Sequence, residues 1–129
     1  MSRGLFDLSG RVVLARIDTQ GDGTRRLCIC QRAKGALAAI IKGLAVEMGP
    51  YGVRANMIAP GFIVSGFMDG APKEQAEGIV RHFSSVTPLG RVGDISDIEG
   101  PAAYLASDAS KFHTGDVLVI DGGWIIRAP

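Results

Sequence analysis

The sequence has few of the residues that mark several common classes of protein. Its two cysteines, Cys28 and Cys30, are too close together for a good disulfide, and two cysteines alone do not make a zinc site. The net charge is +1 and no basic block occurs, which argues against nucleic-acid binding. The longest apolar stretch, residues 35–48, is interrupted by Lys42 and Glu47 and is therefore a poor membrane span. With no secretory signal pattern either, these absences predict a reduced, cytoplasmic protein without nucleic-acid or membrane partners.

What the sequence does have is apolar surface. Hydrophobic residues make up 47% of the 129 residues, a large share for a length that predicts one domain. A small domain buries a smaller fraction of its surface than a large one does. We therefore expect the excess to fill a tight core or to be covered by another subunit.

Apolar periodicity predicts an alternation of strands and helices. Three short apolar runs, at residues 10–15, 53–59 and 116–121, are typical of buried strands, and the last is apolar enough to be central in a parallel sheet. A helix is expected from about Gln31 to the stop signal at 49–52, with one apolar stripe formed by Leu37, Ile40, Ile41, Leu44 and Met48.

Two more helices are expected between the second and third strands. Pro72 suits the first turn of one, and Asp94 or Ser96 can cap another that runs to about Ala106. Residues 16–26 are polar and contain glycine, and predict a loop. This order of elements predicts a parallel α/β sheet covered on both faces.

Two long stretches carry a family resemblance. "AKGALAAIIKGLAVEMGPYGVRANMIAPGFIVSGFM" and "TPLGRVGDISDIEGPAAYLASDASKFHTGDVLVIDGG" resemble the C-terminal half of a short-chain dehydrogenase/reductase, from Ala33 to Gly123. The resemblance implies an α/β fold, a truncated Rossmann-like parallel sheet of about three strands with flanking helices. It also implies a single domain with an N-terminal strand region (1–15), an atypical loop or join (16–32) and a family-like part (33–129). Members of the family are usually about twice as long, so much of their N-terminal half has no counterpart.

The first strand fits the family in two ways. "LFDLSGRVVLA" (5–15) is similar to the N-terminus of the family as it enters its first strand. It is equally similar to the strand before the catalytic serine of the family, which often begins with Gly-Arg-Val-Val. In the second case Thr19 is the nearest hydroxyl to the serine position.

The helix beginning "CICQRAKGALAAI" carries the catalytic residues that the resemblance implies. Lys34 matches the lysine that contacts the nicotinamide ribose and lowers the pKa of a tyrosine one helical turn earlier. Cys30 occupies the position of that tyrosine. A thiol is shorter than a phenol and a weak donor, so Cys30 is a poor substitute for it. A cysteine beside a lysine at the start of a helix is alternatively a reactive nucleophile, and its simplest interpretation is a small apolar side chain.

A proline-glycine loop carries the cofactor contacts that the resemblance implies. Pro60, Gly61, Ile63 and Ser65 match the segment whose backbone and hydroxyl hold the nicotinamide carboxamide of NAD or NADP. The loop follows a predicted strand, where ligands of parallel α/β proteins bind. A structural strand-to-helix turn is the alternative.

The phosphate-binding half of a dinucleotide site has no such match. Gly21 and Gly23 lack the third glycine and the immediate apolar helix of a dinucleotide fingerprint, and are interpreted as a turn.

Three functions remain open at this point. The lineage is that of an NAD(P)-dependent oxidoreductase, but the missing glycine loop, serine and tyrosine argue against present hydride transfer. The first alternative is a non-catalytic α/β module that self-associates through the 33–49 helix and the 116–121 strand, both of which lie at subunit interfaces in the family. The second is a hydrolase-like enzyme that uses Cys30 or Lys34 as nucleophile. Asn56 is expected to be a hydrogen-bonded buried amide, and His82 and His113 to be unpaired surface or turn residues.

Overall fold

A computed structural model describes residues 12–16, 23–64 and 72–127, and for residues 12–16 and 23–34 it describes the backbone alone. The described elements are β1 (Val12–Arg16), α1 (Gly23–Met48), the 3₁₀ turn η1 (Gly49–Tyr51), β2 (Arg54–Pro60), α2 (Lys73–Val86), α3 (Ser96–Ala106), the 3₁₀ turn η3 (Asp108–Ser110), β3 (Val117–Ile120) and the 3₁₀ turn η4 (Trp124–Ile126).

The three described strands form one parallel sheet in the order β1-β2-β3. The central strand is therefore β2, and the prediction that residues 116–121 are central is wrong for the sheet as described. The prediction failed because a short apolar run is compatible with an edge strand as well as with a central strand. In the 3-2-1-4-5-6 order of a doubly wound sheet, the first strand pairs with the second and fourth strands, whereas the last strands pair in sequence order. The order β1-β2-β3 favours the interpretation of β1 as the strand before the serine position.

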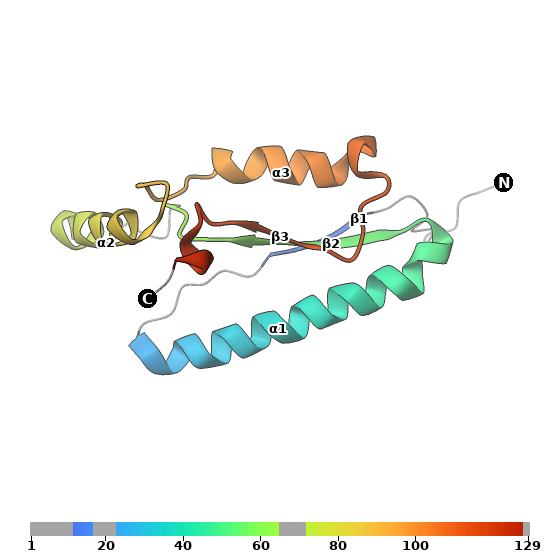
Figure 1. Ribbon diagram of the computed structural model, residues 1–129, viewed down its shortest axis with the longest axis horizontal. Helices are drawn as coiled ribbons and strands as arrows, with labels where there is room; N and C mark the ends of the chain where they lie inside the picture. The colour runs from blue at the N-terminus through green and yellow to red at the C-terminus, as the bar shows by residue number, and fades with distance from the viewer. Residues whose placement is uncertain (1–11, 17–22, 65–71, 128–129) are drawn as a thin grey trace.

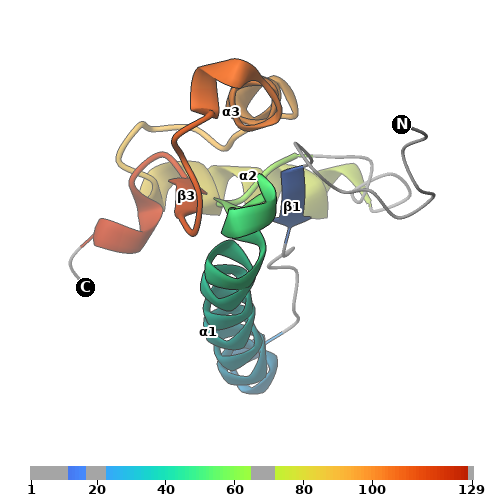
Figure 2. The same cartoon turned by 90° about the vertical axis from the view of Figure 1, so that its right-hand side faces the viewer.

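Helices cover both faces of the sheet. In Figures 1 and 2, α1 runs along one face, antiparallel to β2, and α3 lies on the other. The core beneath α1 consists of Ile41 and Ala45 from the helix with Ala55 and Met57 from β2. On the opposite side, Leu105 of α3 is fully buried. Burial along β2 on both faces explains why its sequence does not alternate between apolar and polar residues.

Helix α1 differs from its prediction at its start. It begins at Gly23 rather than near Gln31, so the expected loop at 16–26 and join at 16–32 become helical from Gly23 onward. The physical reason is that no proline or glycine interrupts residues 24–34, and arginine and leucine favour helix. The helix ends at Met48 as predicted, and Gly52 follows it in the left-handed region with φ 72°.

The apolar stripe of α1 is also slightly rotated from the predicted one. Ile41 is 1% exposed, whereas Ile40 is 56% exposed and faces away from the sheet. Within the described residues no helix is both long enough and apolar enough to cross a membrane.

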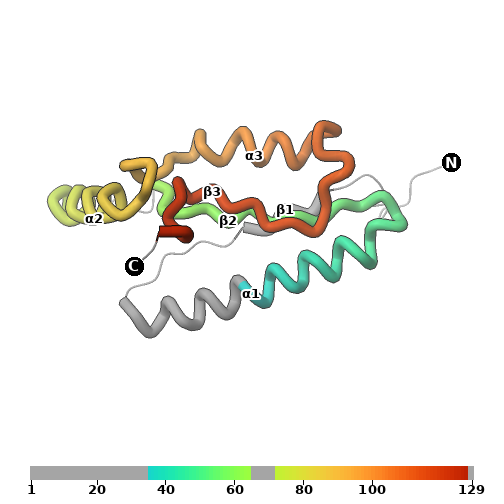
Figure 3. The backbone as a smooth tube through the Cα atoms, in the orientation of Figure 1, coloured from blue at the N-terminus to red at the C-terminus, as the bar shows by residue number. Residues whose placement is uncertain are grey.

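The predicted helices between β2 and β3 are confirmed. Pro72 directly precedes α2, where its missing amide costs no helical hydrogen bond. Helix α3 begins at Ser96 and includes Pro101. The backbone trace in Figure 3 shows that the turn between these helices lies beside the ends of β2 and β3.

Candidate functional site

Three loops meet at the carboxyl ends of the strands and enclose a cavity of about 110 Å³. They are the segment after β2, the turn between α2 and α3, and the segment after β3. Ligands of open parallel sheets bind at this end. The lining residues are Gly61, Phe62, Ile63, Thr87, Leu89, Arg91, Gly93, Asp97, Ile120, Asp121 and Gly122.

Two glycines let the loops approach each other this closely. A Cβ on Gly61 would lie 2.7 Å from Cα of Asp121, and a Cβ on Gly122 would lie 2.7 Å from Cγ2 of Thr87. Both distances are shorter than carbon atoms tolerate, so a side chain at Gly61 would displace the backbone of Asp121 and one at Gly122 would displace the side chain of Thr87. The amide of Gly61 also donates to the carbonyl of Ile120 over 2.9 Å, which ties the ends of β2 and β3 together.

The segment after β2 is held in an extended conformation by the turn before α3. The amide of Gly93 donates to the carbonyl of Phe62 over 2.9 Å, and the amide of Val64 donates to the carbonyl of Gly93 over 2.8 Å. This pair forms a parallel bridge between Ile63 and Gly93. In such a bridge the amide and carbonyl of the middle residue point the other way. The N–H and C=O of Ile63 therefore face away from Gly93.

One wall of the cavity carries a charged pair. The guanidinium of Arg91 donates to both carboxylate oxygens of Asp97, each over 2.7 Å, in a bidentate ion pair. These hydrogen bonds from Arg91, followed by the amide of Asp94, hold the pKa of Asp97 well below its ordinary range. The side chain of Asp97 is consequently an anion whenever the protein is folded near neutral pH.

The segment after β3 is stabilised by the carboxylate of Asp121. It accepts hydrogen bonds from the amides of Gly123 and Ile125, both over 2.8 Å. Phe62, Phe83 and Trp124 form an aromatic cluster beside it, in which the Phe62 and Phe83 rings stack with centroids 4.2 Å apart. These contacts give Asp121 a structural role in the turn that follows β3.

The structure brings three of the predicted site residues together. Pro60 is the buried last residue of β2, and Gly61 and Ile63 line the cavity next to it. Ser65 lies outside the described residues, as do Thr19 and Gly21. Cys30 and Lys34 lie one turn apart on α1, and their side chains are outside the description.

Sequence reasoning missed the other side of the cavity, which includes Thr87, Arg91 and Asp97. The signal for the ion pair was present, because two opposite charges flank a glycine in "RVGDISD". No periodicity rule pairs residues six apart across a turn, so the contact could not be derived from spacing.

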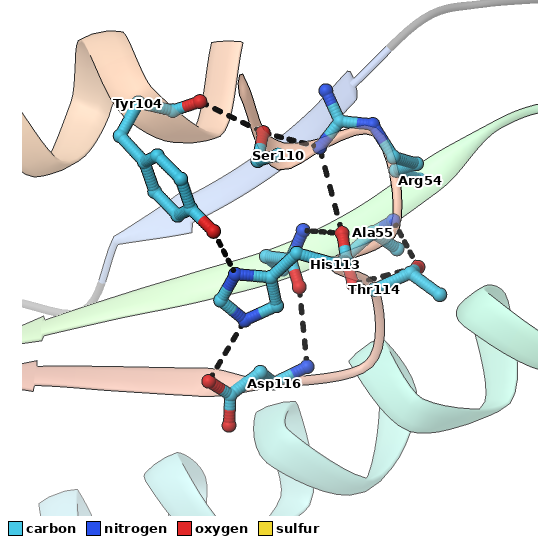
Figure 4. Close-up of polar contacts among 8 residues, drawn as sticks. Arg54, Ala55, Tyr104, Ser110, His113, Thr114 and Asp116 are labelled. Carbon is cyan, nitrogen blue, oxygen red and sulfur yellow. Dashed lines mark hydrogen bonds and ion pairs between the residues drawn. The ribbon is translucent and has the colours of Figure 1, made fainter. Parts of the chain in front are cut away.

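A second polar cluster lies at the opposite, amino end of the strands (Figure 4). Asn56 is fully buried, donates to the carbonyl of His113 over 2.9 Å and accepts from the amide of Asp116 over 3.2 Å. The expectation of a hydrogen-bonded buried amide is confirmed. The guanidinium of Arg54 donates to the carbonyl of Leu105 over 3.0 Å and so caps the end of α3.

His113 corrects a prediction. It was expected to be unpaired, but its ring lies 2.9 Å from a carboxylate oxygen of Asp116 and 3.2 Å from the hydroxyl of Tyr104. The hydrogen bond from His113 is the main reason that the pKa of Asp116 is lowered. Within the described residues this cluster adjoins no part of the cavity lining, and we interpret it as a structural junction between α3 and β3.

Comparisons with known proteins agree with this architecture. Residues 1–125 match a family described as Enoyl-(Acyl carrier protein) reductase. The L-rhamnose 1-dehydrogenase (NAD(P)(+)) of Azotobacter vinelandii is 35% identical over 96 residues, which cover 73% of this chain and 36% of that protein. The 2-dehydro-3-deoxy-D-gluconate 5-dehydrogenase of Pseudoalteromonas atlantica is 38% identical over 95 residues, which cover 74% of this chain and 37% of that protein.

A solved structure extends the likeness to the fold. The gluconate 5-dehydrogenase of Burkholderia cenocepacia, solved in complex with NADP and tartrate, superposes with a TM-score of 0.75 at 28% identity. The alignment covers 92% of this chain and 46% of that chain. The present chain thus spans about a third of the length of the curated relatives and about half of the solved structure.

The parallel sheet, its two helical layers and the cavity at the strand ends define a Rossmann-like α/β protein. More narrowly, the chain belongs to the short-chain dehydrogenase/reductase family.

Proposed function

We propose that the segment after β2, on the side to which Ile63 turns its N–H and C=O away from Gly93, forms the nicotinamide side of an NAD(P) site. The proposal rests on one observation above all, the bridge that turns the N–H and C=O of Ile63 away from Gly93. A nicotinamide carboxamide offers one carbonyl acceptor and one amino donor, which match this pair of backbone groups. The bound NADP of the Burkholderia relative and the name of the Azotobacter relative support the choice of cofactor.

The residues around the loop fit such a group. Gly61 has no side chain, and this lets the loop lie against β3. A Cβ at this position would lie 2.7 Å from Cα of Asp121 and would push the loop away. Ser65, at the position where the family has a hydroxyl, is the residue we expect to complete the carboxamide contacts.

We propose further that hydride transfer by this chain is slow. A bound nicotinamide supplies or accepts the hydride, and the protein must hold the proton that accompanies it. Cys30 stands at the position of the tyrosine acid of the family, and loss of a positioned general acid costs about 10²–10⁴-fold in rate. Lys34 remains to contact the ribose.

Fluorescence titration with NADH and NADPH tests the cofactor proposal. We expect saturable binding of at least one of them, weakened in Gly61→Ala and unchanged in Gly78→Ala. Gly78 lies in α2 with no atom within 4 Å of its would-be Cβ, so it is a matched control for the added methyl group. The proposal fails if the parent chain binds neither cofactor at millimolar concentration.

A specific observation also favours self-association. Val46 on α1 is 78% exposed and Ile40 is 56% exposed, while Val119 on β3 is 43% exposed. We propose that a second copy of the chain covers α1 and β3. Light scattering of Val46→Lys should give a smaller mass than the parent, whereas Glu99→Lys on α3 should not. A parent chain that is a folded monomer would refute this proposal.

A further inference from the structure

The position of the segment that carries Ile63 depends on the turn before α3. The segment is hydrogen bonded to Gly93 through Phe62 and Val64, so its place depends on where Gly93 stands. Contact between the two segments is tight, because a Cβ on Gly93 would lie 2.5 Å from Cδ1 of Ile63. Any shift of the turn before α3 is therefore passed to the segment after β2.

The turn is fixed on both sides of Gly93 by one ion pair. Arg91 precedes the glycine and Asp97 follows it, and their bidentate contact closes the turn into a loop. Oδ2 of Asp97 also accepts from the amide of Asp94 over 2.9 Å, and it would lie 3.4 Å from a Cβ on Gly93. The carboxylate thus accepts three hydrogen bonds from the turn, two from Arg91 and one from the amide of Asp94.

Helix α3 gives the turn less backbone support than an ordinary helix would. Pro101 lies inside it and has no amide to donate to the carbonyl of the residue four positions earlier, which is Asp97. Side-chain contacts add to the backbone hydrogen bonds that begin α3, which run from the amides of Asp97 and Ile98 to the carbonyls of Asp94 and Ile95. Asp94 accepts from the amide of Ser96 over 2.7 Å, and Asp97 reaches back to the amide of Asp94, an arrangement similar to a capping box.

We propose that Arg91 and Asp97 are positioning residues for the nicotinamide contact. By fixing Gly93, they fix the direction in which the N–H and C=O of Ile63 point, and they act through the backbone without touching the cofactor. This inference rests on the proposed function of the segment after β2. It adds that cofactor affinity depends on an ion pair on the far side of the bridge.

The test compares Asp97→Asn, which removes the charge at nearly constant shape, with Glu99→Gln, an exposed carboxylate on the same helix. Amide hydrogen exchange of Val64 and Gly93 reports on the bridge, and fluorescence titration with NADH and NADPH reports on affinity. We expect Asp97→Asn to speed both exchange rates and to raise the Kd by about tenfold, which corresponds to about 1.4 kcal/mol of binding free energy. Glu99→Gln should match the parent in both measurements.

Two further variants separate positioning from general stability. Asp97→Glu keeps a carboxylate that can pair with Arg91, and it should restore most of the affinity. Leu105→Val is a buried change in α3 away from the cavity, and it should lower the Tm without raising the Kd. If Asp97→Asn fails to fold, Arg91→Gln removes the same pair from the other side.

The outcomes distinguish the two proposals. A parent chain that binds no cofactor refutes the proposed function and with it the positioning role, and the exchange rates of Val64 and Gly93 in Asp97→Asn then decide only whether the ion pair fixes the bridge. A parent chain that binds, with Asp97→Asn unchanged in affinity and exchange, overturns the positioning role and leaves the cofactor site standing. The positioning role would also be overturned if Leu105→Val raised the Kd as much as Asp97→Asn does, because the loss of affinity would then result from lower overall stability.

Discussion

Replacing Gly61 with alanine is the sharpest perturbation of the site. The added Cβ would lie 2.7 Å from Cα, 2.8 Å from Cβ and 3.2 Å from the carbonyl oxygen of Asp121. None of these atoms belongs to the flexible end of a side chain, so the ends of β2 and β3 must separate. That separation strains the 2.9 Å hydrogen bond from the Gly61 amide to the Ile120 carbonyl. Forced overpacking of this kind costs about 1–3 kcal/mol.

The control substitution is expected to change the free energy of unfolding in the opposite direction. Gly78→Ala adds the same methyl group to the interior of α2, where nothing lies within 4 Å. Glycine in a helix interior is less favourable than alanine by about 0.5–1 kcal/mol, so the control should stabilise the chain. Chemical denaturation measures both free energies of unfolding. Equal stability of Gly61→Ala and Gly78→Ala would refute the close approach of the two strand ends.

Three other substitutions test other parts of the structure. Asn56→Ala should lower the free energy of unfolding by about 1–3 kcal/mol, because the amide of Asp116 loses its side-chain acceptor and the carbonyl of His113 keeps only the 3.5 Å hydrogen bond from Arg54. His113→Ala should make the loss of stability below about pH 5 less steep. Because the pKa of Asp116 is lowered in the folded state, its carboxylate stabilises the fold at pH values above the unfolded pKa, and this contribution is lost as the pH falls through the folded pKa. Cys30→Tyr should give a phenol with a pKa below the ordinary value of about 10, measured by ultraviolet titration, because Lys34 is one helical turn away.

Each of these has a contradicting result. Asn56→Ala at parental stability would mean that its two hydrogen bonds contribute nothing. An acid transition of His113→Ala as steep as that of the parent would remove His113 as the cause of the Asp116 shift. For Cys30→Tyr the control is Cys28→Tyr, which lies off the lysine face; equal phenol pKa values in the two variants would contradict the pairing with Lys34.

Much of the fold could be predicted because its signals are local. Apolar runs predicted β2 and β3, and the glycines and proline at 49–52 predicted the end of α1. The start of α1 could not be predicted, because residues 24–30 have helical propensity but no apolar stripe. The central position of β2 depends on which strands pair, and strand order is not contained in the pattern of a single strand.

The candidate site was predictable only on one side of the cavity. Pro60, Gly61 and Ile63 form a contiguous motif, which sequence reasoning can detect. Arg91 and Asp97 become neighbours only when the turn around Gly93 closes, and their contact is a property of the folded chain. The same holds for His113 and Tyr104, which come from separate elements.

The central claim is that the backbone of Ile63 meets a nicotinamide carboxamide. The most direct test follows the backbone amide resonances of the isotopically labelled chain while reduced nicotinamide mononucleotide is added. We predict a saturable shift of the Ile63 amide, with smaller shifts at Gly61 and Val64 and none at His113 in the opposite cluster. An Ile63 resonance that stays fixed at millimolar ligand, or shifts no larger than those at His113, would contradict the assignment.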